Sequence, residues 1–579
     1  MKNEIDSYGF TWPGKIESLI EAGRPTDKTL RPILQDSVNF DSTENIYIEG
    51  DNLDALKIIL KSYMRRVKMI YIDPPYNTGN DFVFRDDFSQ SEEESQRSLG
   101  FEDDSGRNYS SEIYRDNKKS NPRFHSEWCS MIYPRLKLAH MLLSDDGVIF
   151  ISIDDNEQAK LRMICDEIFG ENNFVACILW KGRGGRQDSK YFAVIHEYIL
   201  CYAKSSANFH AGERIKKGDK YPKYDKQRKQ RYKTQLLRKW GSGSKREDRP
   251  NLFYPITAPD GSELYPMLTA TQEGRWRWGK AIMQEAIQSG HVEFVKDKNG
   301  AWTAYEKIYE GEITTKKYDT WIDDISNGTE ALKELFGYSP FDYSKSPELI
   351  AQLMNMANLD RDSIILDFFA GSSTTAHAVM SLNAQDSGRR KFIMIQIAEP
   401  CPEKSEARKA GYETISQIGR ERIRRAGENL MCDNQQLTTN NYTLDIGFRA
   451  FRVESSNYRN IFMYPDKLSQ ENISDMADNI KHDRSDMDLL FMCAANFGLP
   501  MSLPYHAEIV DGFTVHIYGD NDIAACFGEN ISEEAVKFVA KLKAGHSVFR
   551  ESCFDGVCSR INLEQIFDAY SDGKKMMIL

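Results

Sequence analysis

Hydrophobic runs alternate with amphipathic stretches near the start of the chain and again beyond residue 340. The pattern predicts a strand that ends at Gly50, a helix from Leu53 to about Tyr63 and a strand from Val67 to Ile72. Further buried strands are predicted at residues 145–154, 196–204, 363–369 and 391–400. Strands that alternate with helices in this way are typical of parallel sheets with helices on both faces. The sequence therefore predicts an α/β fold with a doubly wound, Rossmann-like sheet.

The α/β pattern is interrupted once and later ends, which divides the chain into four predicted parts. Residues 1–180 contain an N-terminal segment and the first half of the sheet. Residues 181–336 are basic and rich in Trp and Tyr, and we interpret them as an inserted domain. The sheet resumes in residues 337–430, and we expect residues 431–579 to form a C-terminal α+β domain.

The composition is that of a globular protein large enough for several cores, with 579 residues of which 40% are hydrophobic and 28% charged. Ten cysteines are scattered without a CxxC pair, so neither a zinc site nor a disulfide framework is indicated. The N-terminus lacks the basic and apolar regions of a signal peptide, and no stretch approaches the roughly 18 apolar residues of a membrane span. We therefore expect a cytoplasmic protein without a metal site.

A formal net charge of −12 argues against nucleic-acid binding, but the charge is unevenly distributed. Residues 211–250 contain fifteen Lys or Arg against five Asp or Glu, and Tyr and Trp lie among these cations. Cations interleaved with aromatic rings are typical of surfaces that follow phosphates and stack on bases, although a solvated loop has the same composition. The candidate phosphate contacts are Lys226, Arg228, Lys229 and Arg231. Arg275 and Arg277, which flank Trp276, are the candidate base readers, although Trp at alternate positions also fits one face of a buried strand.

The run Asp73-Pro74-Pro75-Tyr76 follows a predicted buried strand, at the edge of the sheet where open α/β folds bind ligands. The Asp73 carboxylate and the Pro74 carbonyl are two acceptors that could hold the N–H bonds of an exocyclic amine. Two prolines stiffen the loop and donate no N–H, and Tyr76 could stack on a base taken out of a duplex. The alternative is a proline-rich turn whose Asp caps a neighbouring N–H.

A second strand, turn and helix is predicted in ILDFFAGSSTT, residues 365–375. Gly371 permits close backbone approach, and the N-terminus of the following helix offers N–H groups to an anion such as a carboxylate. A phosphate site or a plain tight turn would have the same pattern, but no GxGxxG or GxxxxGK[ST] motif is present. Asp51 could bind an adenine or simply cap a helix, and Glu399 ends a strand where an acid commonly binds ribose hydroxyls.

Seven motifs occur in the order that is characteristic of one enzyme family: GDNLDAL, IDPPYNTGNDFVF, FHSEW, GVIFISIDDNE, HEYIL, KSPELI and DFFAGSSTT. Together they resemble the beta group of DNA amino-methyltransferases, in which the catalytic DPPY motif precedes the cofactor turn and a target-recognition domain lies between them. FTWPGK, RPNLFYPI, GRWRWGK and GFRAFRVESSN further resemble the modification (Mod) subunit of type III restriction-modification systems.

The resemblance implies site-specific methylation of the exocyclic amino group (N6) of adenine in double-stranded DNA, with S-adenosyl-L-methionine as methyl donor and no metal. It implies a homodimer and a helicase-nuclease restriction (Res) partner. The residues that it assigns to the target amine are Asp73, Pro74, Pro75 and Tyr76. Those that it assigns to the cofactor are Asp367, Phe368, Ala370, Gly371 and Ser372, with Lys345, Ser346 and Pro347 beside them. Asp51, Asn52 and Glu399 are further cofactor candidates because they lie at the end of a predicted strand or in the turn after one. The family's ribose-binding acid usually stands where this chain has Gln396.

Other functions remain open at this point. A solitary methyltransferase would have the same catalytic residues, and an adjacent helicase-nuclease gene would distinguish the two. Methylation of cytosine, RNA or protein glutamine is disfavoured, because those enzymes more often have Ser or Asn in place of Asp73. A DNA-binding specificity module without catalysis is disfavoured by two intact motifs, and a nicotinamide-dependent oxidoreductase by the missing glycine fingerprint.

Overall fold

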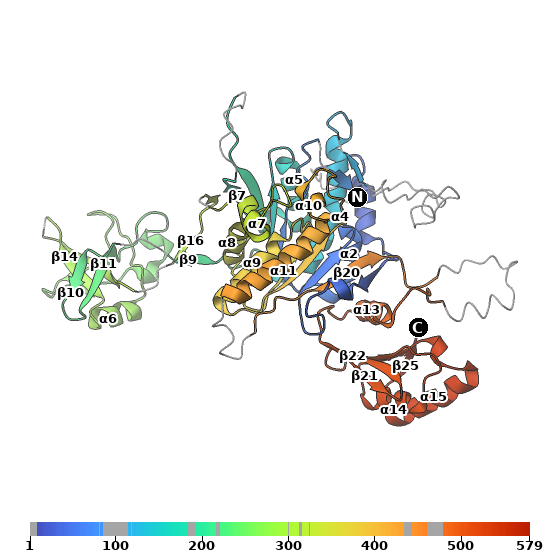
Figure 1. Ribbon diagram of the computed structural model, residues 1–579. Helices are drawn as coiled ribbons and strands as arrows, with labels where there is room; N and C mark the ends of the chain where they lie inside the picture. Colours follow the sequence, from blue (N-terminus) through green and yellow to red (C-terminus); the bar gives the residue numbers. More distant parts are fainter. Residues whose placement is uncertain are drawn as a thin grey trace, which may run out of the picture. The chain divides into compact units, whose positions relative to one another are not determined.

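The computed structural model describes residues 9–79, 82–84, 114–116, 118–182, 191–215, 220–298, 300–311, 315–323, 325–433, 443–459 and 479–579. The chain divides into two compact units (Figure 1). The larger unit combines Met1–Gly212 with Asp319–Leu579, and the smaller unit is Glu213–Tyr318.

A ten-stranded sheet forms the centre of the larger unit. From edge to edge its strands are β1 (Thr29–Pro32), β20 (Arg449–Glu454), β2 (Ile46–Glu49), β19 (Lys391–Gln396), β18 (Ile364–Asp367), β3 (Val67–Ile72), β6 (Leu143–Ile153), β8 (Glu197–Ala203), β7 (Phe174–Trp180) and β17 (Trp321–Ile322). The six strands from β20 to β6 are all parallel, and β8 is antiparallel to both β6 and β7. The predicted α/β fold with a doubly wound sheet is confirmed.

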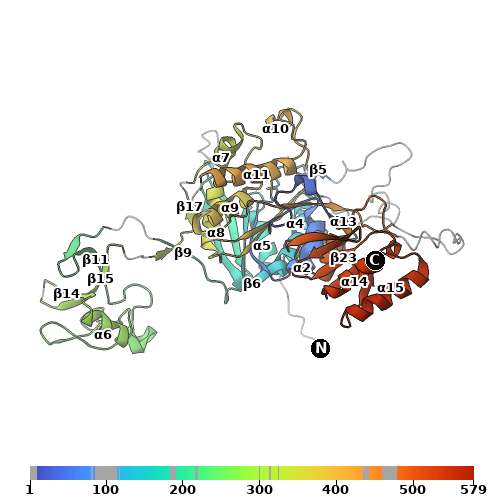
Figure 2. The ribbon, with the colours of Figure 1, turned by 60° about the horizontal axis from the view of Figure 1, so that its bottom comes forward.

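Both faces of the sheet are buried, because successive side chains of a strand point to opposite faces. In β3, Val67, Ile70 and Ile72 pack in one core, whereas Met69 and Tyr71 pack in the other. Helices cover both faces (Figure 2). The first core includes residues of α2 (Asn52–Tyr63), α4 (Phe124–Leu142), α5 (Gln158–Phe169) and α13 (Asp486–Phe497), and α1 (Lys15–Gly23) packs on α4. The second includes residues of α8 (Pro347–Met356), α9 (Thr374–Asp386) and α11 (Ile415–Asp433), and α11 also packs with α7 (Gly328–Phe336) and α10 (Glu406–Lys409).

The strand order reverses between β18 and β3. From β18 the chain runs through α9 to β19 on one side, whereas from β3 it runs through α4 to β6 on the other. β18 and β3 are themselves parallel neighbours, with Leu366 opposite Ile70. Such a reversal leaves a crevice at the carboxyl ends of the two strands, where open α/β sheets bind ligands. The motifs that follow Ile72 and Asp367 therefore meet at this point.

The smaller unit is built on a four-stranded antiparallel sheet. Its strands, in order, are β10 (Lys223–Asp225), β11 (Gln230–Leu236), β15 (Trp302–Tyr309) and β14 (Val292–Lys296). The remaining elements of the unit are α6 (Lys280–Gln288) and the strand pairs β9 (Glu213–Ile215) with β16 (Thr315–Lys317) and β12 (Ile256–Thr257) with β13 (Glu263–Leu264). This unit is narrower than the domain 181–336 expected from composition, because β8 and β17 pair in the large sheet.

The C-terminal part of the larger unit contains a second sheet of five strands. Its strands are β21 (Tyr505–Val510), β22 (Phe513–Tyr518), β23 (Ile523–Cys526), β24 (His546–Phe549) and β25 (Met576–Ile578), accompanied by α14 (Glu533–Lys541) and α15 (Gly556–Tyr570). The predicted range 431–579 also contains β20, which pairs in the large sheet.

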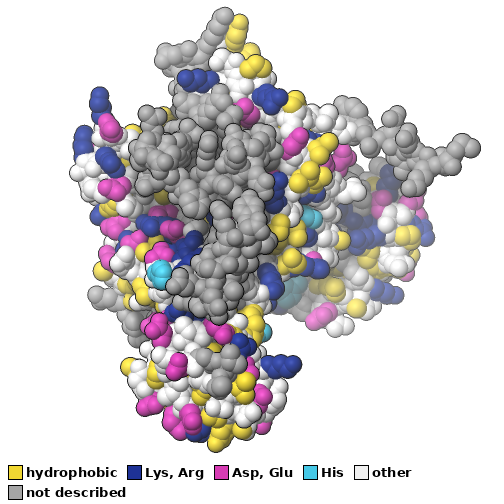
Figure 3. All heavy atoms as spheres, turned by 90° about the vertical axis from the view of Figure 1, so that its right-hand side faces the viewer, with side chains coloured by type: hydrophobic (Ala, Val, Ile, Leu, Met, Phe, Trp, Pro, Cys, Tyr) yellow, Lys and Arg dark blue, Asp and Glu magenta, His cyan; other side chains and the backbone are white. Residues whose placement is uncertain are grey.

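On the face in Figure 3, Lys and Arg side chains lie interspersed with Asp and Glu. A short strand pair, β4 (Phe82–Phe84) with β5 (Tyr114–Asp116), completes the described elements.

Candidate active site

The loop of residues 73–77 leaves the carboxyl end of β3 and is held by buried neighbours. The indole Nε1 of fully buried Trp128 donates a hydrogen bond to the Pro75 carbonyl at 2.7 Å. Asn77 has a φ of 57° and its amide donates to Glu157 Oε1 at 2.6 Å. These bonds to α4 and to the start of α5 fix a loop whose two prolines already restrict the backbone. The resulting loop is rigid, and it holds the Asp73 carboxylate at the edge of the sheet.

Asp73 lies in a cluster of four polar side chains from three separate segments. The Lys345 ammonium, just before α8, contacts Asp73 Oδ2 at 3.0 Å, Glu197 Oε2 at 3.1 Å and the Tyr76 hydroxyl at 2.9 Å. The Tyr76 oxygen lies 2.9 Å from both Asp73 Oδ1 and Glu197 Oε2. Burial raises the pKa of Asp73 above its usual value, although the Lys345 ammonium lowers it.

The turn after β18 forms the second part of the site. Gly371 has a φ of 51°, in the left-handed region that favours glycine, and its N–H donates to Gln396 Oε1 at 2.7 Å. α9 begins at Thr374, so the first N–H groups of a 13-residue helix lie at this turn. The Asn52 amide donates to the Phe368 carbonyl at 2.8 Å and joins the turn to the first residue of α2. The turn thus offers backbone donors suited to an anion.

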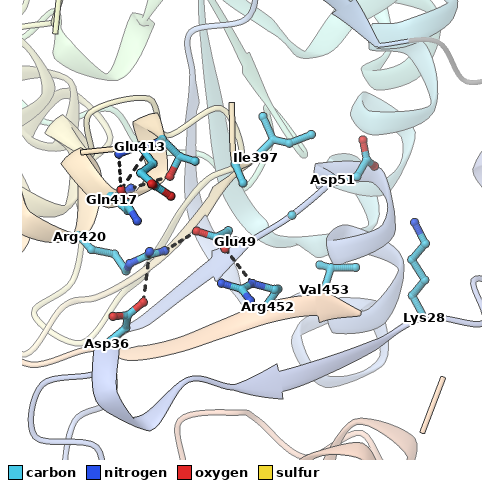
Figure 4. A pocket seen from close by; sticks show the side chains of 13 residues that line it. Lys28, Asp36, Glu49, Asp51, Ile397, Glu413, Gln417, Arg420, Arg452 and Val453 are labelled. Carbon is cyan, nitrogen blue, oxygen red and sulfur yellow. Dashed lines mark hydrogen bonds and ion pairs between the residues drawn. The ribbon is translucent and has the colours of Figure 1, made fainter. Parts of the chain in front are cut away.

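A cavity of about 480 Å³ opens where β2 and β19 end, and it is lined by Glu49, Gly50, Asp51, Ile397 and Ala398 among others. Figure 4 shows Glu49 between Arg420 and Arg452, with Asp51 at the start of the neighbouring helix. Glu49 pairs with both arginines at 2.8 Å, and these cations hold its pKa below the usual value although burial acts to raise it. The volume lies in the range of small-molecule pockets.

A family model described as DNA methylase matches residues 67–406, which is more than half of the chain. The chain belongs to the DNA methylase family. The match spans both the loop after β3 and the turn after β18. It confirms the predictions of a DNA methyltransferase and of S-adenosylmethionine as its methyl donor.

Several relatives of this DNA methylase are Mod subunits of type III restriction-modification enzymes. The StyLTI Mod subunit of Salmonella typhimurium is 35% identical over 77% of this chain and 66% of its own length. The EcoPI Mod subunit of Escherichia phage P1 is 34% identical over 77% of this chain and 71% of its own length. The type II methyltransferase M.KpnI of Klebsiella pneumoniae is 34% identical over 67% of this chain and 89% of its own length. The chain spans about two thirds of the length of these two Mod subunits. The predicted resemblance to type III Mod subunits is confirmed.

The structure brings most of the predicted cofactor residues of the methylase to the carboxyl edge of the sheet. Asp51 lines the cavity and also caps α2, accepting from the N–H of Leu53 at 2.8 Å, so both of its expected roles are compatible. Lys345 joins the turn through its carbonyl, which accepts from the Thr374 hydroxyl at 3.2 Å, whereas its ammonium lies at Asp73. Ser346 caps α8 and Pro347 is the first residue of that helix. The roles of these residues stay predictions.

The acid for the ribose is also still a prediction. Gln396, at the position usual for that acid, is buried and bonded to Gly371. Glu399 lies three residues farther on, is half-buried, and burial raises the pKa of its carboxyl. Neither residue is among those that line the cavity, whereas Glu49 and Asp51 are.

Sequence reasoning did not assign roles to Trp128, Glu157 and Glu197, although each stands in a recognised motif. FHSEW contains Trp128, IDDNE contains Glu157 and HEYIL contains Glu197. Their contacts reach partners between 53 and 148 residues away along the chain. The signal in the sequence was the motif itself, but only the fold shows which side chains each motif contacts.

In the smaller unit, the candidate DNA contacts fall into two groups. Lys226, Arg228 and Lys229 are exposed in the turn between β10 and β11, and Arg231 is exposed in β11. Arg275 donates to the Gly243 carbonyl at 2.5 Å, and Arg277 pairs with Glu306 at 2.8 Å. Trp276 between them is buried in the core of the unit, as expected for one face of a buried segment. Within the described residues, none of these four exposed cations pairs with a carboxylate.

Across the part of the chain that the structure describes, no helix is both long and apolar enough to span a membrane. The same residues contain no cluster of three or more His, Cys, Asp or Glu that could hold a metal ion.

The first testable consequence concerns Asp367, which is fully buried at the end of β18. Burial raises its pKa to about 7, although the Thr375 hydroxyl donates to it at 2.6 Å. An Asp in the unfolded chain ionises near pH 4, so between about pH 4 and 7 the folded protein binds more protons and the free energy of unfolding falls as pH rises. We expect Asp367→Asn to reduce the loss of Tm between pH 5 and pH 8.

The control for this measurement is Asp386→Asn. Pairing with Arg390 lowers the pKa of Asp386, although burial acts to raise it, so its contribution to stability is lost only at more acidic pH. This variant should show the same change in Tm between pH 5 and pH 8 as the wild type. An unchanged pH dependence in Asp367→Asn would contradict the burial of an ionisable Asp367.

Proposed function

We propose that the protein methylates the exocyclic amino group (N6) of adenine at a specific site in double-stranded DNA, as the modification subunit of a type III restriction-modification system. The observation that carries this proposal is the adjacency of β3 and β18 in the sheet. It supports a crevice at which the acceptors of residues 73–76 face the turn at Gly371, whose helix N-terminus would bind an anion. A target amine and a methyl donor held there would lie side by side.

The chemistry follows from the poor nucleophilicity of an adenine amine, whose lone pair is delocalised into the ring. The Asp73 carboxylate and the Pro74 carbonyl would accept hydrogen bonds from the two N–H groups of the amine. These bonds would orient the nitrogen toward the methyl donor. S-adenosylmethionine supplies an electrophilic methyl group when bound. The backbone donors after β18 would hold its carboxylate, and Asp51 would bind its adenine in the cavity at β2 and β19.

The deciding experiment is a search for modified bases in the DNA of cells that express the protein. Sequencing should detect N6-methyladenine in one sequence context, and the purified protein should transfer a labelled methyl group to duplexes that contain this sequence. Modified cytosine in place of adenine would contradict the proposed target, and unmodified DNA in both tests would contradict the function.

The smaller unit is proposed as the target-recognition domain. Its exposed cations at residues 226–231 would neutralise phosphates, so DNA affinity should fall steeply as salt rises. We predict that replacing Lys226, Arg228, Lys229 and Arg231 together by Ala flattens the slope of log K against log salt by a few units. Affinity for specific and for random DNA should fall alike, and cofactor affinity should not change. The measurement is a salt titration of DNA binding, and parallel slopes would show that these residues are a solvated turn.

The partners are proposed from the relatives. Similarity to Mod subunits favours assembly with another subunit of a restriction-modification enzyme. We propose that this chain forms a homodimer that associates with a helicase-nuclease Res subunit in the cytoplasm. The match to 89% of the type II methyltransferase M.KpnI favours a second candidate, a methyltransferase that acts without such a subunit. The two differ in their genes and complexes: an adjacent helicase-nuclease gene whose product co-purifies with this chain supports the first, and its absence from the neighbourhood supports the second.

A further inference from the structure

Lys345 is enclosed between two carboxylates and two aromatic rings. Its side chain is only 11% exposed, and the ammonium contacts Asp73, Glu197 and the Tyr76 hydroxyl, each within 3.1 Å. The same nitrogen lies 5.0 Å from the centre of the Tyr76 ring and 5.5 Å from that of Trp180, where ring faces attract a cation. An ammonium has three N–H donors, and the three acceptors around it match that number. The position of this side chain is therefore fully determined by its neighbours.

Glu197, from β8, is the second carboxylate of the cluster. Its side chain is 8% exposed, whereas that of Asp73 is 26% exposed. Its Oε2 lies 3.1 Å from the Lys345 ammonium and 2.9 Å from the Tyr76 oxygen. A carboxylate with so little access to solvent is costly to bury unless it is paired. The contacts of Glu197 with Lys345 and Tyr76 therefore offset the free-energy cost of burying its carboxylate.

We propose that Lys345 and Glu197 are positioning residues of the methyl-transfer site: Lys345 holds the Asp73 carboxylate ionised and oriented, and Glu197 anchors both Lys345 and the Tyr76 ring. This inference rests on the proposed function, because it gives Asp73 the role of acceptor for the target amine. The Asp73 side chain is 26% exposed, so an amine can reach its carboxylate beside the existing contacts. Each carboxylate oxygen has a second lone pair, and one contact from Lys345 or Tyr76 leaves it able to accept another.

The two positioning residues have opposite effects on the pKa of Asp73. An ionised Asp73 is the better acceptor, so activity should rise with pH as this carboxyl loses its proton. Lys345 lowers the pKa of Asp73, whereas Glu197 raises it. Among the described residues, the titratable groups that interact with Asp73 also include Tyr76, Tyr71 and Asp367. Removing the cation should raise the pKa of Asp73 further, and removing the second carboxylate should lower it.

The test is the pH dependence of single-turnover methyl transfer to a duplex that contains the recognised sequence. Lys345→Met should move the acidic limb of the profile to higher pH by about one to three units, the range expected for losing an opposite charge within hydrogen-bonding distance. Glu197→Gln, which keeps the shape of the side chain, should move the same limb to lower pH. Lys345→Arg, which keeps the charge, should bring the limb back toward that of the wild type. General damage to the fold would lower the rate without shifting the two profiles in opposite directions.

Matched controls are available elsewhere in the chain. Glu167 also bonds a lysine and a tyrosine, Lys15 at 2.7 Å and Tyr133 at 2.8 Å, and Lys57 is a buried lysine that pairs with Glu21 at 2.6 Å. Glu167→Gln and Lys57→Met should leave the pH profile of activity unchanged. Calorimetry should show that Glu197→Gln binds S-adenosylmethionine as the wild type does.

Two outcomes would overturn the inference. One is a limb that stays at its wild-type position in both Lys345→Met and Glu197→Gln. The other is a profile that moves in the same direction in both variants. Failure of the proposed function has a different signature, because Asp73→Ala would then remain active or wild-type protein would methylate no adenine. The inference alone fails if Asp73→Ala is inactive while the Lys345 and Glu197 variants keep the wild-type profile.

Discussion

Replacing Asp73 by Ala should lower methyl transfer by at least about 100-fold while the affinity for S-adenosylmethionine stays unchanged. The substitution removes one of two acceptors for the target amine, and loss of one preorganised electrostatic partner costs about this factor in other enzymes. The substitution leaves the turn after β18 unchanged. In that turn the Gly371 N–H donates to Gln396, and the Phe368 carbonyl accepts from the Asn52 amide. Single-turnover methylation and calorimetry with the cofactor would measure the two effects separately.

Asp145→Ala is the control for that variant. Asp145 is an exposed carboxylate that pairs with Arg65 at 2.6 Å, and this pair contacts no residue of the crevice. Its loss should leave methyl transfer within about twofold of the wild type, because exposed ion pairs contribute little. Near-normal activity of Asp73→Ala in the same assay would remove Asp73 from the catalytic site.

Replacing Gly371 by Val should abolish detectable binding of S-adenosylmethionine in a protein that remains folded. The nearest atom that an added Cβ would meet is Phe341 Cζ at 3.8 Å, an ordinary contact, so clash within the protein is not the cause. The φ of 51° is the cause, because a β-branched residue is strongly disfavoured in the left-handed region. The turn would then shift, and the N–H groups at the start of α9 would lose their alignment. Calorimetry with the cofactor and circular dichroism are the two measurements.

Gly512→Val is the control for Gly371→Val, because it introduces similar backbone strain away from the turn after β18. Gly512 lies in the turn between β21 and β22 with a φ of 83°, and no atom lies within 4 Å of an added Cβ. This variant should lose a similar amount of stability and still bind the cofactor. Retained binding by folded Gly371→Val would place the cofactor elsewhere.

The sequence predicted the elements around the crevice closely, because each is coded by local patterning. The strand expected from Val67 to Ile72 is β3, and the helix expected from Leu53 to Tyr63 is α2 apart from its first residue. Both have continuous hydrophobic or amphipathic runs bounded by Gly or Asp, which short-range rules detect. The placement of DPPY after β3 follows directly from those runs.

The sequence did not predict the contacts that complete the site, because they join distant segments. Glu197 and Lys345 lie 148 residues apart, with the smaller unit between them in the chain. Hydrophobic periodicity carries no information about such a pair. The strand at residues 196–204 was predicted, but the basic composition beyond residue 181 assigned it to the insert together with the segment of β17. Its pairing with β6 and β7, and the pairing of β17 with β7, place both strands in the large sheet. Local patterns therefore identify the strands and loops of this methylase, whereas pairing between strands decides which side chains meet.

The antiparallel pairing of β9 with β16 places the entrance and the exit of the smaller unit beside each other. Glu213 lies opposite Lys317, and Ile215 lies opposite Thr315, so the chain leaves the unit about 5 Å from where it enters. A segment with adjacent ends can be exchanged for one of a different length or sequence without pulling on the scaffold from which it leaves. If the smaller unit recognises DNA as proposed, recombination at these two strands would give related enzymes new recognition sequences while the methyl-transfer site is inherited unchanged.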